Sequence, residues 1–114
     1  MHELSIAMNM IEMATDELKK HDGTRVHALH LKLGGLSGVV KDALLFSWKI
    51  ACQGTPLEDS RLEIEEIPVV FYCTNCEAKK MPDSINYFFC PSCQLPASKI
   101  LQGRELEVTA LEII

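Results

Sequence analysis

The sequence predicts an α+β fold: a small mixed sheet with two helices on one face, plus an inserted zinc-ribbon-like module. Three observations lead to this prediction. Apolar residues recur with helical spacing in two segments and alternate with polar ones in three others, and four of the five cysteines form two Cys-x-x-Cys pairs. The predicted organisation is one α+β domain, residues 1–70 with 99–114, and one inserted module, residues 71–98.

The first predicted element is a helix from Leu4 to Lys20, because apolar residues recur there at spacings of three, four and seven (Leu4, Met8, Ile11 and Leu18), and Ala7 and Ala14 widen this apolar stripe. Gly23 is expected to end it in a left-handed conformation. The alternation from Arg25 to Leu33 then predicts a half-buried strand. In a regular strand His27 and His30 lie on opposite faces, so they are not expected to form a two-histidine metal site.

A glycine-rich turn, residues 34–38, leads into a second predicted helix over about residues 39–51. Ser37 is expected to be the N-cap of this helix, and the glycines to permit the tight turn. The turn lacks the residue spacing of a phosphate-binding loop or a nucleophile elbow, which argues against an enzymatic role.

Two more strands complete the predicted sheet. Leu62 and Ile64 alternate with charged residues and predict a second strand. The sequence leaves open whether this strand continues to Phe71 after a break at Pro68. Residues 106–110 alternate in the same way and predict a C-terminal strand.

The two cysteine pairs predict a zinc site formed by Cys73, Cys76, Cys90 and Cys93. Tetrahedral zinc takes four soft ligands, and each Cys-x-x-Cys pair, here called a knuckle, offers two thiolates. Two knuckles therefore fill all four positions, so such a zinc is structural and has no place for a catalytic water. Thioredoxin-type redox chemistry is the less favoured alternative because no helical pattern follows the pairs.

Aromatic residues crowd around the knuckles and are expected to form a miniature core: Phe71, Tyr72, Tyr87, Phe88 and Phe89. The alternative is a base-stacking surface with Lys79 and Lys80. Sixteen acidic residues against 11 basic ones give the 114-residue chain a net charge of -5, which argues against nucleic-acid binding. No stretch is long and apolar enough for a bilayer, and the start does not resemble a signal peptide, so we expect a cytoplasmic protein with reduced thiols.

The N-terminal residues Met1, His2 and Glu3 offer a second candidate metal site. A terminal amine, backbone nitrogen atoms and the His2 imidazole can close adjoining chelate rings around one ion, and this nitrogen-rich set suits Ni(II) or Cu(II). The residues alone favour a simpler interpretation, in which this segment is only the frayed start of the first helix.

Several motifs together resemble the HypA/HybF family of nickel metallochaperones of NiFe-hydrogenase maturation. The resemblance runs nearly end to end and rests on the opening Met1-His2-Glu3-Leu4-Ser5, the 33–40 turn, Ala43-Leu44-x-Phe46, Gly54-Thr55, the four paired cysteines and Gly103-Arg104-Glu105-Leu106. It differs from some members of the family in one respect, because no histidine accompanies the cysteines in the module.

The resemblance implies a function and a set of partners. His2 would be the nickel ligand, with backbone nitrogen atoms around Met1 to Glu3 completing the site, and the four cysteines would hold structural zinc. Nickel would pass to the hydrogenase large-subunit precursor, in concert with a GTPase of the HypB type. No catalysis, nucleic-acid or membrane partner is expected, and a homodimer stays open. The alternative is a zinc-ribbon adaptor that transfers no nickel.

Overall fold

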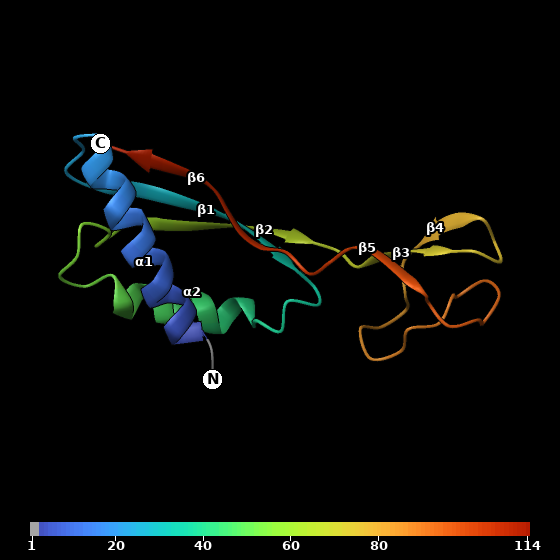
Figure 1. Cartoon of the computed structure of the whole chain (residues 1–114). Helices are drawn as coiled ribbons and strands as arrows, with labels where there is room; N and C mark the ends of the chain where they lie inside the picture. The colour runs from blue at the N-terminus through green and yellow to red at the C-terminus, as the bar shows by residue number, and fades with distance from the viewer. Residues whose placement is uncertain (1–2) are drawn as a thin grey trace. The chain divides into compact units, whose positions relative to one another are not determined.

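The computed structural model describes residues 3–114, and over these residues it contains two helices and six strands. Their order is α1 (Glu3–Lys20), β1 (Val26–Gly34), α2 (Lys41–Ala51), β2 (Arg61–Ile67), β3 (Val70–Cys73), β4 (Ala78–Lys80), β5 (Lys99–Gln102) and β6 (Leu106–Ile113). The strands form two three-stranded sheets, with the orders β2-β1-β6 and β4-β3-β5 (Figure 1). This confirms the predicted α+β class. Among the described residues, no helix has the length and apolar character needed to cross a lipid bilayer.

The chain divides into two compact units, each described here by itself. The helical unit comprises the described residues up to Lys32, with Val39–Glu65 and Glu107–Ile114. The cysteine unit comprises Leu33–Gly38 and Glu66–Leu106. The predicted module, residues 71–98, lies inside this second unit, which also takes in the glycine-rich turn.

The helical unit packs α1 and α2 on one face of the sheet β2-β1-β6 (Figure 1). Leu29 and Leu31 of β1 are fully buried against both helices, as the alternation of that strand predicts. On α1, however, Leu4 and Met8 of the predicted apolar stripe are exposed. The buried stripe is rotated toward Ala7 and Ala14, whose small side chains let the helix approach its neighbours closely (Ala7, Met10, Ile11, Ala14 and Leu18).

The prediction that His27 and His30 lie on opposite faces is wrong. The alternation of β1 breaks near its start, because Ala28 and the adjacent Leu29 are both fully buried while His27 is exposed. One residue out of register moves every side chain before it to the other face of the strand. Val26, Ala28 and Leu29 are all apolar, so the sequence does not show where the alternation of buried and exposed residues breaks.

Both histidines instead reach one cluster of charged side chains on the helical unit. The Arg61 Nη1 and His27 Nε2 atoms lie 2.9 Å apart, and the His30 Nε2 and Glu112 Oε2 atoms lie 2.6 Å apart. The other guanidinium nitrogen of Arg61 is 3.8 Å from Glu112 Oε2 and so links the two contacts. The hydrogen bond from His30 is the main reason that the pKa of Glu112 is lowered.

We expect Glu112→Gln to lower the melting temperature at pH 7 by only about 1–3 °C, because the carboxylate is half exposed. A lowered pKa in the folded state stabilises the protein above the unfolded-state pKa of about 4.3, and this stabilisation is lost as the pH falls through the lowered pKa. The difference between wild type and variant should therefore vanish in acid. Melting curves from pH 2 to pH 7 measure this, with Glu107→Gln on the same strand as the control. A difference that persists at pH 2 would contradict the assignment.

Two predicted helix-capping residues are wrong. It is Asp22, with φ of 53°, that adopts the left-handed conformation after α1, and not Gly23. Gly23 is needed for another reason, since a Cβ there would lie 2.6 Å from Leu18 Cδ1. Ser37 is not the N-cap of α2, because the helix begins at Lys41 after Val40.

The continuation of the second strand also differs from the prediction. The strand does break at Pro68, but β2 ends at Ile67 and β3 begins at Val70 in the other sheet. Proline cannot donate to a ladder of hydrogen bonds, so it marks the point at which the chain leaves one sheet for the other. The C-terminal strand is confirmed and is longer than predicted, while β4 and β5 were not predicted.

Candidate metal centre

The four paired cysteines lie on two similar turns of the cysteine unit. Strand β3 ends at Cys73, and the turn through Cys76 leads directly into β4, which pairs with β3 in antiparallel register. Each turn is followed by a residue in the left-handed conformation, Glu77 with φ of 51° and Gln94 with φ of 65°. Nothing in the residue types of Glu77 and Gln94 predicts this conformation.

The sulfur atoms converge on one point. The Cys73 and Cys93 Sγ atoms are 3.6 Å apart, the Cys76 and Cys90 Sγ atoms are 3.9 Å apart, and all four lie within 4.8 Å of one another. A zinc–sulfur bond of about 2.3 Å gives a tetrahedron whose edges are about 3.8 Å. Among the described residues, these cysteines are also the one group of three or more metal-ligating side chains close enough to share an ion.

Backbone N–H groups favour thiolates at this site. The Cys76 N–H donates to Cys73 Sγ at 3.4 Å. Burial raises the pKa of Cys90, but the backbone N–H groups of Cys93 and Ser92 outweigh it and lower that pKa to about 6. At Cys76, burial and the neighbouring thiols raise the pKa to about 12. Four thiols this close cannot all ionise unless a cation is present, so a divalent ion is the group that suits them.

A small apolar core surrounds the sulfur atoms. Phe71 is fully buried with Cys73 and Cys90, and Ala97 and Ile100 pack against them. The expected five-residue aromatic core is therefore only partly present, since Tyr87 is 51 % exposed. Its ring instead contacts the Phe89 ring in a tilted arrangement, with the centroids 4.6 Å apart and an angle of 37° between the ring planes.

Lys80 makes a side-chain contact within the cysteine unit. Its Nζ atom donates to Ser92 Oγ at 3.1 Å and so ties β4 to the second knuckle. Together, the tetrahedral spacing, the thiolate-favouring N–H groups and the closed shell fit a structural zinc held by Cys73, Cys76, Cys90 and Cys93. All four positions are protein ligands, so none remains for a catalytic water.

Of the predicted nickel site, Met1 and His2 lie outside the described residues. Glu3 is the first residue of α1, and its Oε2 atom accepts a hydrogen bond from the Val40 N–H at 3.1 Å. Val40 is the residue before α2, which has no cap from its own side chain. A carboxylate from a residue 37 positions earlier in the chain therefore satisfies a backbone donor at the start of α2, and sequence spacing alone could not reveal this.

The comparison with protein families decides the identity. Residues 1–113 match the family model described as hydrogenase/urease nickel incorporation, metallochaperone, hypA. The chain belongs to the HypA family. The resemblance found in the sequence is thus confirmed, and HypA is a family of metallochaperones and maturation factors rather than of enzymes.

Relatives from several bacteria carry the name hydrogenase maturation factor HypA. The protein of Chloroflexus aurantiacus is 48 % identical over 112 residues, which cover 98 % of each chain. That of Roseiflexus is 47 % identical over 98 % of this chain and 91 % of its own. That of Picosynechococcus is 33 % identical over the full length of both chains.

Two solved structures share the HypA fold. The solution structure of the Ni metallochaperone HypA from Helicobacter pylori covers 100 % of this chain and 98 % of its own, with a TM-score of 0.66 and 22 % identity. A second solution structure of a HypA protein covers 100 % of this chain and 97 % of its own, with a TM-score of 0.70 and 23 % identity.

Proposed function

We propose that this HypA-family chain binds one Ni(II) ion at its N-terminus and delivers it to the hydrogenase large-subunit precursor. The observation that carries the proposal is the match to a nickel-incorporation family from residue 1 onward. The proposed ligands are the His2 imidazole and nitrogen atoms of the Met1–Glu3 backbone, a set that suits Ni(II).

The position of Glu3 supports this ligand set. An α-helix makes its N–H···O=C bonds from the fifth residue onward, so coordination of nitrogen atoms at the start of α1 leaves the helical ladder intact. The Glu3 carboxylate bonds to Val40, so Glu3 would act through its backbone nitrogen and by anchoring the tripeptide. Because few ligands on one tripeptide hold the ion, ligands of a recipient can replace them one by one without unfolding the core.

The proposed partners follow from the family. A GTPase of the HypB type would assist the transfer in the cytoplasm, and the family description leaves hydrogenase or urease as the recipient. The zinc held by the four cysteines would stabilise the fold of the cysteine unit, and we expect no catalysis of the chain's own.

The test is a nickel titration of the zinc-loaded protein with its native N-terminus, followed by calorimetry and visible absorption. We expect one nickel per chain, and at least a ~100-fold loss of affinity in His2→Ala. Coordination needs the neutral imidazole, so affinity should also fall as the pH drops through the histidine range near about 6.5.

His21→Ala is the matched control, because His21 is an exposed histidine at the other end of α1. It should bind nickel as the wild type does. Equal affinity in wild type and His2→Ala would refute the proposed ligand. If neither bound nickel, the zinc-ribbon adaptor would be the better account of the chain.

A further inference from the structure

The sheet β4-β3-β5 of the cysteine unit has one face that the zinc centre does not use. Phe71 and Cys73 of β3 belong to the small core around the sulfur atoms, and Ile100 of β5 packs against them. Side chains of a strand alternate between the two faces of a sheet, so Tyr72 lies on the opposite face. This opposite face, here called the outer face, holds neither zinc ligands nor the proposed nickel ligands.

Strand pairing places a tyrosine between two lysines on the outer face. In the antiparallel register, Tyr72 of the central strand β3 is the partner of Lys79 on β4 and of Lys99 on β5. Residues directly opposite each other on neighbouring strands project to the same face. Neighbouring strands lie about 4.8 Å apart, so the backbones of the two lysines are separated by about 10 Å, with Tyr72 between them. These three residues are called the lysine–tyrosine row.

The polar groups of the lysine–tyrosine row are not paired within the unit. Both lysines are exposed, and Tyr72 is half-buried. Among residues 3–114, neither Lys79 nor Lys99 forms an ion pair or a side-chain hydrogen bond, and the Tyr72 hydroxyl forms no hydrogen bond. The third lysine of the sheet, Lys80, is the partner of Phe71 on the other face. The row therefore presents two ammonium groups and a phenol to the solvent.

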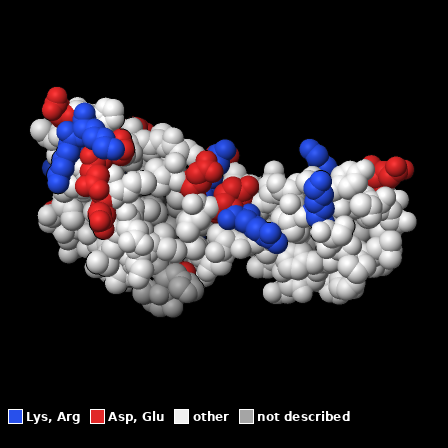
Figure 2. Space-filling model, viewed as in Figure 1, with Lys and Arg blue, Asp and Glu red and all other residues white. Residues whose placement is uncertain are grey.

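The sheet has no acidic side chain that would offset this positive charge. Its three strands read VFYC, AKK and KILQ, so they contain three lysines and no aspartate or glutamate. On the face that Figure 2 shows, the charged side chains over the middle of the cysteine unit are basic. Glu77, just before β4, forms no ion pair with another described residue. The outer face is thus a cationic surface.

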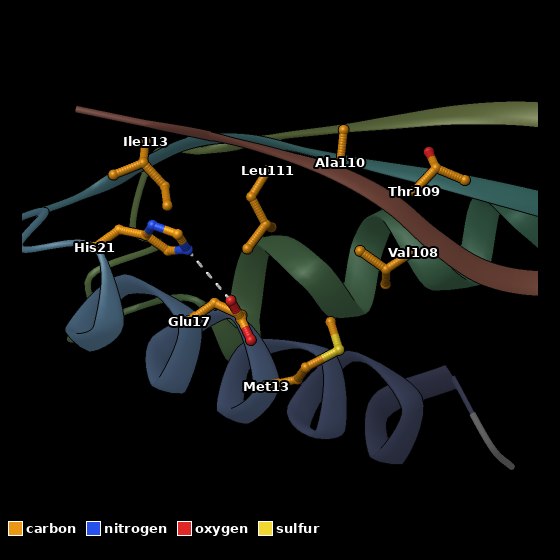
Figure 3. A pocket seen from close by; sticks show the side chains of 8 residues that line it. All are labelled: Met13, Glu17, His21, Val108, Thr109, Ala110, Leu111 and Ile113. Carbon is orange, nitrogen blue, oxygen red and sulfur yellow. Dashed lines mark ion pairs between the residues drawn. The ribbon is translucent and has the colours of Figure 1, made fainter.

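A groove on the helical unit shows the opposite situation. It lies between α1 and β6, has a volume of about 720 Å³ and is lined by side chains from both elements, among them Glu17 (Figure 3). The Glu17 carboxylate already lies 3.4 Å from Lys20 Nζ and 3.5 Å from His21 Nε2. The charge in this groove is satisfied within the unit and selects no ligand, whereas the charges of the lysine–tyrosine row are not satisfied.

The surroundings of the row favour a polypeptide over a nucleic acid. Leu101 is 41 % exposed and follows Lys99 by two residues on β5, so it lies on the outer face as well. Nucleic-acid binding depends on the neutralisation of several phosphates, and two lysines on a chain with a net charge of -5 do not supply it. An acidic peptide that also carries an apolar residue would use both the lysines and the apolar surface.

We propose that the outer face of the sheet β4-β3-β5 binds an acidic, extended segment of a partner protein. Acidic residues at positions i and i+4 with an apolar one at i+2 lie on one side of such a segment and mirror the order lysine, tyrosine, lysine. The two acidic residues are about 13 Å apart, which flexible lysine side chains on backbones about 10 Å apart can meet. This inference does not depend on nickel binding, so either proposal can fail without the other.

The probe is the peptide acetyl-Ser-Glu-Thr-Leu-Thr-Glu-Ser-amide, titrated into zinc-loaded, ¹⁵N-labelled protein. We expect amide shifts that are largest in β3, β4 and β5, and at least ~10-fold weaker binding of a matched peptide with glutamine in place of both glutamates. No shift in these strands at about 5 mM peptide would overturn the proposal. Equal binding of the two peptides would overturn it as well.

Two double variants with the same change of net charge locate the site. Lys79→Gln with Lys99→Gln removes both ammonium groups of the row, while Lys19→Gln with Lys49→Gln removes two exposed ammonium groups of the helical unit. The first should weaken the glutamate peptide at least ~10-fold and the second less than ~2-fold. Equal effects would overturn the proposal. So would a wild-type dimer that the first double variant dissociates, or oligonucleotide binding that it abolishes, because the occupant would then be a second copy or a nucleic acid.

Discussion

Cys73→Ser is expected to release zinc and unfold the cysteine unit. Structural zinc contributes on the order of 10 kcal/mol to small metal-stapled modules, which exceeds what a small apolar core can replace. The core here is one buried phenylalanine with a few smaller apolar neighbours. We expect the zinc content measured by mass spectrometry to fall from one per chain to near zero, and proteolysis to cut within residues 66–106.

Cys52→Ala is the control for this prediction. Cys52 is a buried cysteine of the helical unit, outside the zinc group, and burial raises its pKa to about 11 despite the nearby Ser60 hydroxyl. A thiol kept protonated in this way acts as a small apolar side chain. Cys52→Ala should destabilise the helical unit by about 1 kcal/mol and keep its zinc. Full zinc content and protease resistance in Cys73→Ser would refute the four-cysteine centre.

Gly34→Ala is expected to destabilise the cysteine unit by about 3 kcal/mol or more. The Gly34 N–H donates to the Glu105 carbonyl at 2.7 Å, and the Leu36 N–H donates to the Gly103 carbonyl at 2.6 Å. This close pairing leaves no space, since a Cβ on Gly34 would lie 2.6 Å from the Glu105 nitrogen and still closer to the Gly103 carbonyl. Backbone atoms cannot rotate away as a side chain can, so the clash must separate the two segments.

Gly38→Ala, in the same turn, separates this clash from an ordinary loss of glycine flexibility. Gly38 has φ of 79°, but a Cβ there meets nothing within 4 Å. Only the left-handed conformation is strained, at a cost of about 1–2 kcal/mol. Urea denaturation of the zinc-loaded variants measures both changes. Equal losses in the two variants would mean that steric contact at Gly34 is not what matters.

Much of the fold follows from local patterns. The helical spacing up to Lys20 and the alternation of Leu29, Leu31 and Leu33 identify α1 and β1 to within a residue, because burial of one face imposes a period on the sequence. The cysteine spacing identifies the four sulfur atoms that converge for a similar reason, since a tight turn brings the two thiolates of one pair together.

Features that depend on contacts between distant segments were not predictable in this way. The carboxylate that Glu3 places at the start of α2 involves a separation of 37 residues, and Ser37 was the wrong candidate for that role. The break in β1 that brings His27 and His30 to one cluster lies at Ala28 and Leu29, which are both buried. Neither leaves a periodic signal in the sequence.

The sequence by itself therefore determined the α+β class, the group of four cysteines and the family resemblance, because each depends on residue types at short, fixed spacings. Only the tertiary structure decided which face of α1 is buried, that the chain changes sheets at Pro68, and that β6 is an edge strand beside a groove. The physical reason is that burial and strand pairing depend on the partner surface. Which surface a helix or strand packs against is decided by packing across the whole unit and not by neighbours along the chain.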